Sequence, residues 1–333
     1  MKVTRRSLNA LIAGTPLAAG WTISQAAERK DSVIVGMILE PPGLDPTTAP
    51  AAAIGEIVHY NIFEGLTRVG VDGAVTPLLA ESWAITPDGK SYTFRLRKGI
   101  KFSDGSPMDS AAVKFSFDRA RAPGSTNKAK KAVFDNIARV TAEDPHTVIL
   151  TLNNADATLP FRLGENTAVI LHPNSVDQAA SKPVGTGPFR LESWAKGSAV
   201  TLVKSDAYRD AAKVALKKVT FRFINDPAAQ VAALLAGDID GMPRFGALQA
   251  LKQFQSDSRF TVEMGSTAGK GVLAINNRKK PFDDVRVRRA ISHAIDRKAF
   301  IDGAQEGLGK PIGSHFAPTD NGYVDLTGKY PHD

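Results

Sequence analysis

The chain has 333 residues, 43% of them hydrophobic and 23% charged, which is typical of a folded protein of one large or two medium domains. Its formal net charge is +8, but Lys2, Arg5 and Arg6 supply part of it and the other basic residues are scattered, which argues against a nucleic-acid-binding surface. The absence of cysteine excludes disulfide bonds and a lipidated thiol.

Residues 1–26 have the pattern of a cleavable signal peptide. Arg5 and Arg6 precede an apolar run over 8–19, and the small residues Ser24 and Ala26 follow. Adjacent arginines before such a run are typical of the twin-arginine route, with the general secretory route as the alternative. The run is shorter than the roughly 20 residues of a membrane span. We therefore expect a soluble, exported periplasmic protein without a lipid anchor.

Period-two alternation of apolar and polar residues predicts several strands with one buried face. The clearest cover residues 92–96, 148–152 and 219–223. Asp-Gly pairs at 72–73, 88–89 and 104–105 predict tight turns, because both residue types tolerate positive φ. We interpret the pairs and the strands around them as a turn-punctuated β-meander.

Two segments predict helices. Residues 227–236 carry apolar residues on one face and end before Gly237. Residues 284–301 repeat apolar residues at i, i+3, i+4, i+7 and i+8, which predicts one helix with a buried stripe and a solvated, arginine-rich outer face. Asp283 or Asp284 would cap its first turn.

The sequence contains none of the catalytic or metal-binding motifs that we considered. No two of its six histidines have metal-ligand spacing, and we expect most of them at the surface or in turns. The run from Gly265 to Gly271 departs from a phosphate loop, because Gly271 stands where a hydroxyl should bind magnesium. The run from Gly185 to Pro188 lacks the third glycine of a dinucleotide site. We therefore expect no catalytic residue, no metal and no cofactor, and a binding protein rather than an enzyme.

Eight short motifs then occur in the order in which one known family has them. They are Val35–Pro46, Ile62–Leu66, Leu79–Trp83, Asp88–Arg97, Lys101–Gly105, Gly185–Phe189, Ala233–Asp240 and Pro281–Arg297. Each alone is weak, but together they resemble the extracellular solute-binding proteins of family 5, the dipeptide-, oligopeptide- and nickel-binding components of ABC importers. The resemblance covers about residues 32–315. It departs at Ser103, where the family often has histidine.

The resemblance implies an α/β, type II periplasmic-binding-protein-like fold with mixed sheets and two lobes that close on a ligand. Residues 27–265 would form the first lobe and the stable unit, with a β-rich subdomain at about 60–180. Residues 266–333 would form part of the second lobe. Members of the family are usually longer, so we expect an incomplete second lobe in a truncated or split chain.

The implied function is capture of peptides or peptide-like solutes for the permease subunits of an ABC transporter, by a monomer without a nucleic-acid partner. Peptide-binding members hold an extended ligand largely through its backbone. The candidate ligand-binding residues are Glu40, Pro41, Pro42, Phe63, Glu64 and Trp194. The first three belong to the loop that borders the cleft in similar proteins. An ordinary turn at that loop fits equally well. For Phe63 and Trp194, packing in the core is the favoured interpretation.

Two kinds of alternative stay open. The ligand could be a nickel chelate, haem, an opine or an oligosaccharide, or the chain could be a non-transport exported protein such as a chaperone or a signalling partner. The family's charged anchors for peptide termini lie mainly in the second lobe, beyond the end of this sequence. Loss of two charge-assisted hydrogen bonds of about 1.5–3 kcal/mol each predicts affinity no tighter than about micromolar.

Overall fold

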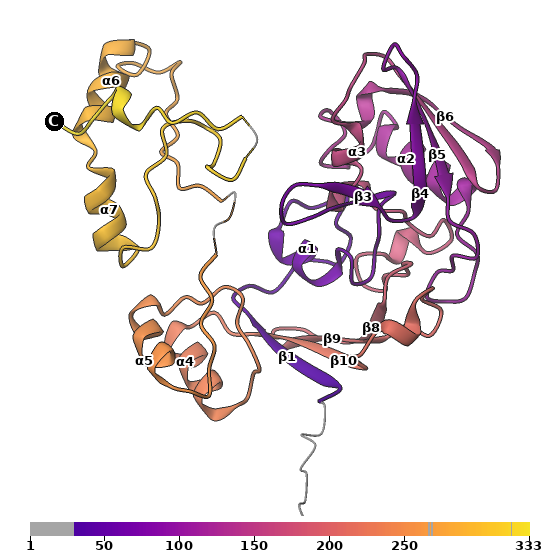
Figure 1. Cartoon of the computed structure of the whole chain (residues 1–333), viewed down its shortest axis with the longest axis horizontal. Helices are drawn as coiled ribbons and strands as arrows, with labels where there is room; N and C mark the ends of the chain where they lie inside the picture. Colours follow the sequence, from indigo (N-terminus) through magenta and orange to yellow (C-terminus); the bar gives the residue numbers. More distant parts are fainter. Residues whose placement is uncertain (1–29, 266, 268, 321) are drawn as a thin grey trace, which may run out of the picture. The chain divides into compact units, whose positions relative to one another are not determined.

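The computed structural model describes residues 30–265, 267, 269–320 and 322–333 (Figure 1). The chain divides into two units, Met1–Lys30 and Asp31–Asp333, and the helices and strands described below belong to the second. The signal peptide predicted for residues 1–26 lies outside the described residues. Within the described part, no helix is long and apolar enough to cross a membrane.

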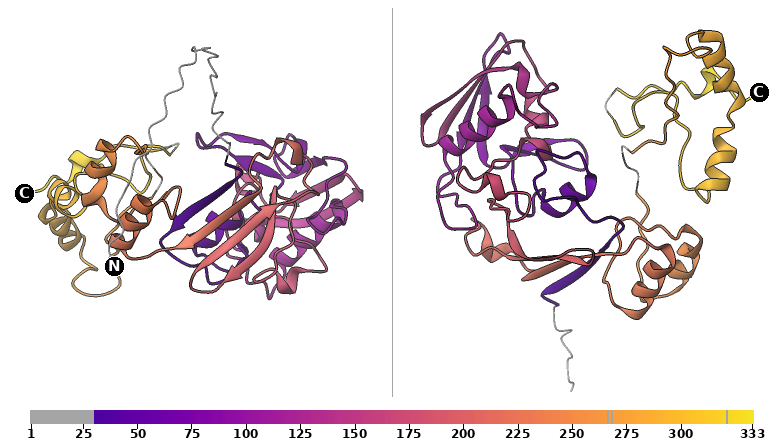
Figure 2. Two further views of the ribbon diagram at one scale, coloured as in Figure 1. Left: turned by 90° about the horizontal axis from the view of Figure 1, so that it is seen from below. Right: turned by 180° about the vertical axis from the view of Figure 1, so that it is seen from behind.

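The first sheet is mixed and has four strands in the order β1-β10-β9-β8. Their bounds are Ser32–Met37 for β1, Phe189–Ala195 for β8, Ala199–Lys204 for β9 and Lys218–Phe223 for β10. β1 pairs with β10 in parallel, and the other pairs are antiparallel. Figure 2 shows the indigo β1 beside the orange strands from much later in the chain. The strand predicted over 219–223 is confirmed.

Residues 240–242 cover the outer edge of β1, where another strand of the sheet could otherwise pair. The Asp240 N–H donates to the Ile34 carbonyl at 2.7 Å, and the Gly36 N–H donates to the Gly241 carbonyl at 2.8 Å. A Cβ at Gly36 would lie 2.7 Å from the Met242 sulfur, so the segment packs directly on the strand. The contact satisfies backbone groups that an open edge would expose.

The second sheet is antiparallel and has the order β4-β5-β7-β6. Its strands are β4 (Ala80–Ile85), β5 (Ser91–Leu96), β6 (Ile137–Asp144) and β7 (Thr147–Leu152), and a separate hairpin pairs β2 (Thr67–Val69) with β3 (Val75–Pro77). The strands predicted over 92–96 and 148–152 are confirmed.

The three predicted Asp-Gly turns are confirmed, since the glycines have φ of +76°, +68° and +91°. The meander prediction is only partly right. Helix α2 (Ser110–Arg121) interrupts the strands between β5 and β6, and β7 lies between those two strands in the sheet. The α2 helix begins where the Asp109 carboxylate accepts hydrogen bonds from the Ala111 and Ala112 N–H groups, so a local cap redirects the chain.

Each sheet has its own hydrophobic core. In the second sheet, Phe94 of β5 and Phe117 of α2 are 0% and 1% exposed within one cluster. In the first, helix α1 (Ala52–Val58) contributes Ile54 and Ile57, which share a cluster with β9 of that sheet. Full burial of one such side chain contributes about 1.5–3 kcal/mol, so both cores contribute to the stability of the fold.

Three further helices are α3 (Leu159–Arg162), α4 (Pro227–Ala236) and α5 (Leu251–Ser256). Short 3-10 turns lie at Phe134–Asn136, Asn166–Ala168, Val176–Gln178, Ala211–Lys213, Leu248–Ala250 and Thr327–Lys329. Helix α4 has the predicted bounds and ends at Gly237, whose φ is +75°.

The prediction of one helix over 284–301 is wrong. The structure has two helices, α6 (Val285–Ala294) and α7 (Arg297–Ala304), separated by extended backbone at Ile295. Asp284 caps α6 as expected, but Asp296 caps α7 by accepting from the Ala299 N–H at 2.8 Å, and this second cap ends the first helix.

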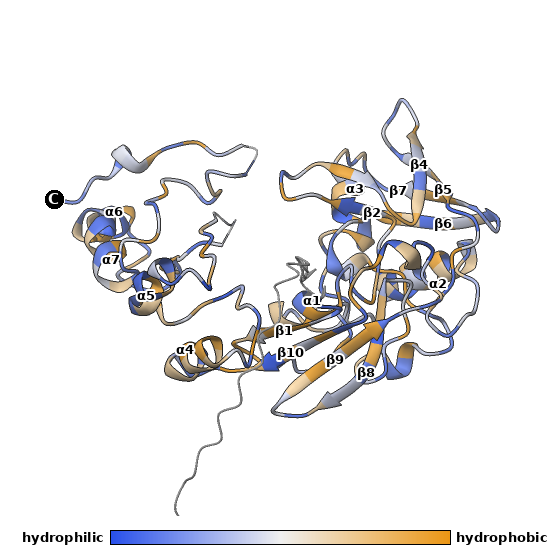
Figure 3. Ribbon diagram, turned by 60° about the horizontal axis from the view of Figure 1, so that its bottom comes forward, coloured by the Kyte–Doolittle hydropathy of each residue, from blue (hydrophilic) through white to orange (hydrophobic). Residues whose placement is uncertain are grey.

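The buried stripe predicted for this helix is also wrong. No residue of α6 or α7 is buried, and Ile295 and Phe300 are 38% and 61% exposed. Figure 3 shows polar and apolar residues mixed along both helices. Helical periodicity fixes which residues share a face, but it does not supply the partner that would cover that face.

Candidate functional site

A cavity of about 660 Å³ opens among three segments that are distant in sequence, 49–60, 128–132 and 161–167, together with Val69. Much of its wall is small or apolar. The polar and charged side chains of the wall are His59, Tyr60, Lys128, Glu165, Asn166 and Thr167. The volume of the cavity lies within the range of small-molecule sites, although the cavity is open to solvent.

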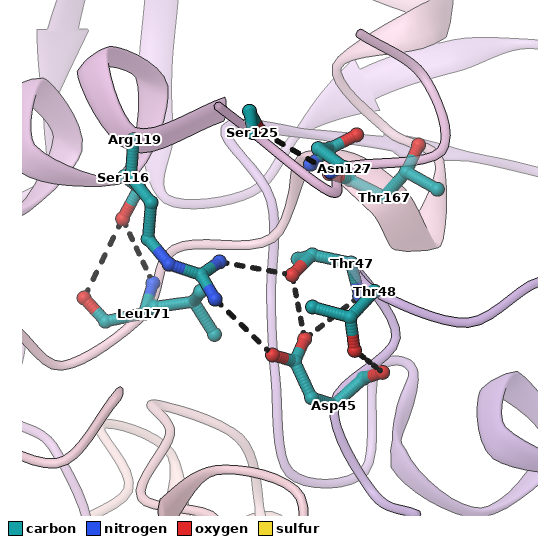
Figure 4. A network of polar contacts seen from close by, with 9 residues as sticks. All are labelled: Asp45, Thr47, Thr48, Ser116, Arg119, Ser125, Asn127, Thr167 and Leu171. Carbon is teal, nitrogen blue, oxygen red and sulfur yellow. Dashed lines mark hydrogen bonds and ion pairs between the residues drawn. The ribbon is translucent and has the colours of Figure 1, made fainter. Parts of the chain in front are cut away.

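A polar network of Asp45, Thr47 and Arg119 holds the loop that leads to Ala49 and Pro50 (Figure 4). The buried Asp45 carboxylate accepts hydrogen bonds from the Thr47 N–H at 2.8 Å and the Thr47 hydroxyl at 2.6 Å. Arg119 of α2 donates to that hydroxyl at 3.1 Å and lies 3.6 Å from the carboxylate. This wall of the cavity is therefore fixed to α2.

A second part of the network joins the other two segments. The Asn127 side chain donates to the Thr167 carbonyl at 2.9 Å and accepts from the Ala129 N–H at 2.8 Å. The Lys128 N–H donates to the Thr47 carbonyl at 3.1 Å, which closes the link back to the first loop. These hydrogen bonds between side chains and backbone hold the three segments of the wall together.

Tyr60 is a strained residue in the wall. Its φ is +60°, a left-handed conformation that costs a non-glycine residue roughly 1–2 kcal/mol. Its hydroxyl donates to the Gly164 carbonyl at 2.7 Å and accepts from the Val69 N–H at 3.1 Å, and its ring stacks on His59 at 3.8 Å. These contacts hold one aromatic ring in a fixed position at the cavity, where strained residues often serve ligands.

Two titratable groups of the wall are desolvated. Burial lowers the pKa of His59 to about 4, against a smaller raising effect of the Gly164 carbonyl, so the imidazole is neutral at pH 7. Its Nε2 atom is buried and has no hydrogen-bond partner among the described residues. Burial also raises the pKa of Glu165, with Arg162 acting in the opposite direction. The wall thus combines a neutral imidazole with a carboxylate that water solvates poorly.

The structure brings two predicted site residues together away from this cavity. The Trp194 Nε1–H donates to Glu40 Oε1 at 2.9 Å, and the Gly197 N–H donates to Glu40 Oε2 at 3.0 Å. Trp194 also packs on the core of the first sheet, and the Lys196 ammonium lies 3.0 Å from its ring centroid. Of the two prolines that follow Glu40, Pro41 is buried and Pro42 is exposed.

The other predicted residues lie in the interior. Phe63 is fully buried, and Glu64 is 2% exposed. Arg209 donates to both Glu64 carboxylate oxygens at 2.8 Å, and the Thr186 hydroxyl adds a third hydrogen bond at 2.9 Å. The carboxylate of Glu64 therefore has a complete set of partners within the protein.

None of the six predicted residues lines the cavity. Their role in ligand binding stays a prediction that depends on the resemblance. Sequence reasoning missed the cavity because its wall includes Ala49, Ala129 and Ala132, small residues without a motif. It expected most histidines at the surface or in turns and did not single out His59, which is partly buried in the wall.

A family model described as bacterial extracellular solute-binding proteins, family 5 Middle, matches residues 74–333. The chain therefore belongs to the family 5 bacterial extracellular solute-binding proteins, which confirms the resemblance in its sequence.

Curated relatives and solved structures agree with this family assignment. The "Probable D,D-dipeptide-binding periplasmic protein DdpA" of Escherichia coli (strain K12) is 31% identical over 95% of this chain and 63% of that protein. The Helicobacter pylori binding protein DppA, in complex with the peptide STSA, is 28% identical with a TM-score of 0.78, over 91% of this chain and 64% of that one. AgaA of A. tumefaciens R10, in complex with agropinic acid, is 30% identical with a TM-score of 0.78, over 91% of this chain and 62% of that one.

These similarities confirm the predicted α/β periplasmic-binding-protein fold with mixed sheets. The chain spans about 63% of the length of the curated relative DdpA.

Proposed function

We propose that this chain binds a short peptide or peptide-like solute in the periplasm and presents it to the permease subunits of an ABC importer. The observation that carries the proposal is the cavity of about 660 Å³ on a family 5 scaffold, with its loops already fixed by hydrogen bonds. Binding, rather than catalysis, is the role that we assign to it. The leader predicted over 1–26 would deliver the protein, which would act as a monomer.

The cavity wall suits a peptide chemically. It holds one carboxylate, on Glu165, and one ammonium group, on the exposed Lys128, so it offers a partner to each end of a zwitterion. Small and apolar residues between them leave room for ligand side chains of different shapes. The six residues predicted from the resemblance remain candidates for contacts outside the cavity.

Titration calorimetry of the protein, after removal of the leader, against di- to pentapeptides tests the proposal. We expect saturable binding that is weakened by Ala132→Trp, because Ala132 lines the cavity and its side chain is exposed, so tryptophan fills space without disturbing the core. Ala138→Trp is the matched control, since Ala138 is exposed on β6 and outside the cavity. Equal weakening by both variants, or no peptide binding, would contradict the proposal.

An opine is the second candidate ligand. AgaA, which was solved with agropinic acid, is 30% identical to this chain with a TM-score of 0.78. Agropinic acid should therefore be included in the same titration. If the protein binds agropinic acid and no peptide, its proposed ligand would be an opine instead of a peptide.

A further inference from the structure

We propose that the exposed apolar side of helices α6 and α7 is a docking surface for a further stretch of polypeptide, of the kind that forms the part of DdpA outside its match to this chain. The occupant is protein and not solute, so the inference stands apart from the proposed ligand binding.

Residues 266–333, here called the tail, have many apolar side chains but hardly any core. Nine of the fourteen large apolar side chains that are exposed in the described part of the chain lie in the tail. Among the described residues of the tail, Ala317 is the one buried apolar residue. Apolar side chains gathered in this way are unfavourable in water, and such surfaces mark sites of protein contact.

Helix α6 is the clearest case. Its apolar stripe is partly buried at Val287 and Ile291 and exposed at Ala290 and Ala294. Phe300 of α7 is 61% exposed. A stripe with this spacing normally packs against another element, and no element of the described chain buries it.

Polar contacts within the tail nevertheless hold both helices. The Asp284 and Asp296 carboxylates cap their first turns, each at 2.8 Å from a backbone N–H. At the end of α6, the His293 carbonyl accepts from the Asp333 N–H at 3.1 Å, and the His293 Nδ1 atom lies 2.7 Å from the Pro331 carbonyl oxygen. The apolar side is therefore formed in advance, and a partner can bind it without first ordering the helices.

The charges of α6 favour a protein partner over a polyanion or an anionic membrane. Arg286 pairs with the Asp284 carboxylate at 2.7 Å. Arg288 donates to the Phe282 and Asp283 carbonyls at 2.8 and 3.1 Å. Because these arginines already have partners within the tail, phosphate groups would have to compete with those contacts.

The relatives indicate what kind of protein fits. The family model covers the tail, so the tail has the sequence pattern of family 5. The chain matches 63% of DdpA, so more than a third of that relative lies outside the match and contains polypeptide that can pack on this pattern.

Co-expression tests the docking surface. The probe is a DdpA fragment that begins where the match to this chain ends, produced in the same cells as the chain without its leader. We expect a one-to-one complex in sedimentation velocity. Hydrogen exchange at the amides of residues 285–304 should be slower in the complex than in the chain alone.

Two variants locate the contact. Ile295→Asp and Phe300→Asp should each weaken the complex at least about tenfold, because each places a charge on the covered surface. Both side chains are exposed in the chain alone, so neither change disturbs its fold. Val71→Asp is the matched control, since Val71 is exposed between β2 and β3 and lies outside the tail.

Absence of a complex, or a complex that both variants form as well as the wild type, would overturn the docking surface. Dimers of the chain alone with the same slow exchange would assign the surface to a second copy. Slow exchange on phosphatidylglycerol vesicles, without an effect of the fragment, would assign it to a membrane. Either result would overturn the proposed partner. No solute enters these measurements, so their failure and a failure of peptide binding are distinguishable.

Discussion

Two glutamates, Glu64 and Glu165, differ in their surroundings in the folded chain. Glu64 receives three hydrogen bonds from Arg209 and Thr186, whereas Glu165 lies at a cavity without a donor among the described residues. The sequence made Glu64 a candidate through its Glu-Gly-Leu motif and gave no sign of Glu165. Pairing with a residue 145 positions away is a property of the folded chain, so one sequence could not predict which of the two glutamates is paired.

The buried ion pair predicts a large effect on stability. Glu64→Gln or Arg209→Met should lower the free energy of unfolding by about 3 kcal/mol, because each leaves a buried charge without its partner. Urea unfolding of the single and double variants measures this, and the double variant should lose less than the sum of the two.

Lys217→Met is the control for the ion pair. Its partner Asp31 lies at 2.8 Å, but both side chains are largely exposed, so little change is expected. An effect as large as that of Arg209→Met would mean that burial does not decide the strength of the pair.

His59 predicts a defined pH dependence of stability. Its folded pKa of about 4 lies below the ordinary value of 6.5, so between these values the unfolded state binds the proton and the folded state does not. Above pH 6.5 the contribution of His59 to the free energy of unfolding is at its full value. It decreases by roughly 3 kcal/mol in total as the pH falls towards 4. His59→Phe should remove this part of the loss in urea unfolding at a series of pH values.

The control for His59 is His315→Gln, since His315 is exposed. Glu165 acts in the opposite direction, because a raised carboxyl pKa stabilises the fold at low pH, and it remains in both variants. An identical pH profile for His59→Phe and wild type would contradict the neutral, buried imidazole.

At the scale of elements, the local sequence pattern predicted strands and turns, because their formation depends mainly on neighbouring residues. Period two identified strands β5, β7 and β10, and Asp-Gly pairs identified turns. The pattern failed at Asp296, where helical periodicity continues but a carboxylate caps a new helix. It also could not predict the order β4-β5-β7-β6, because pairing depends on packing against α2.

At Gly185 and Gly187 the backbone lies in close contact with the backbone of Asn61 and Ile62. A Cβ at Gly187 would lie 2.4 Å from the Asn61 carbonyl oxygen. Gly187→Ala should therefore destabilise the protein by about 1–3 kcal/mol, the range for overpacking. Gly124→Ala should be neutral or slightly stabilising, because nothing lies within 4 Å of its Cβ and its φ is not positive. Thermal unfolding compares the two, and similar midpoints would argue against the clash.

At the scale of the whole molecule, burial is uneven along the chain. The two cores draw on residues 37–221, where many side chains are fully buried. Several large apolar side chains after residue 270 are exposed, including Phe300 at 61%, Val324 at 56% and Phe316 at 49%. Segments with few buried apolar contacts open at low free-energy cost.

We therefore predict that residues 266–333 are cleaved first in limited proteolysis. Arg278, Lys279 and Arg289 are exposed there and offer trypsin sites. Mass spectrometry of the first fragments should show a resistant product that retains residues 31–265. First cleavage within the second sheet, or uniform resistance, would refute this division of stability.

The parallel pairing of β1 with β10 also orders the folding of the chain during synthesis. A nascent chain that ends before Lys218 contains β1 without the strand to which it binds. β8 and β9 form an antiparallel hairpin from neighbouring residues, so they can pair as soon as they emerge. The strand made first is thus among the last to join its sheet, and the backbone next to Asp31 stays unpaired until about two thirds of the chain has left the ribosome.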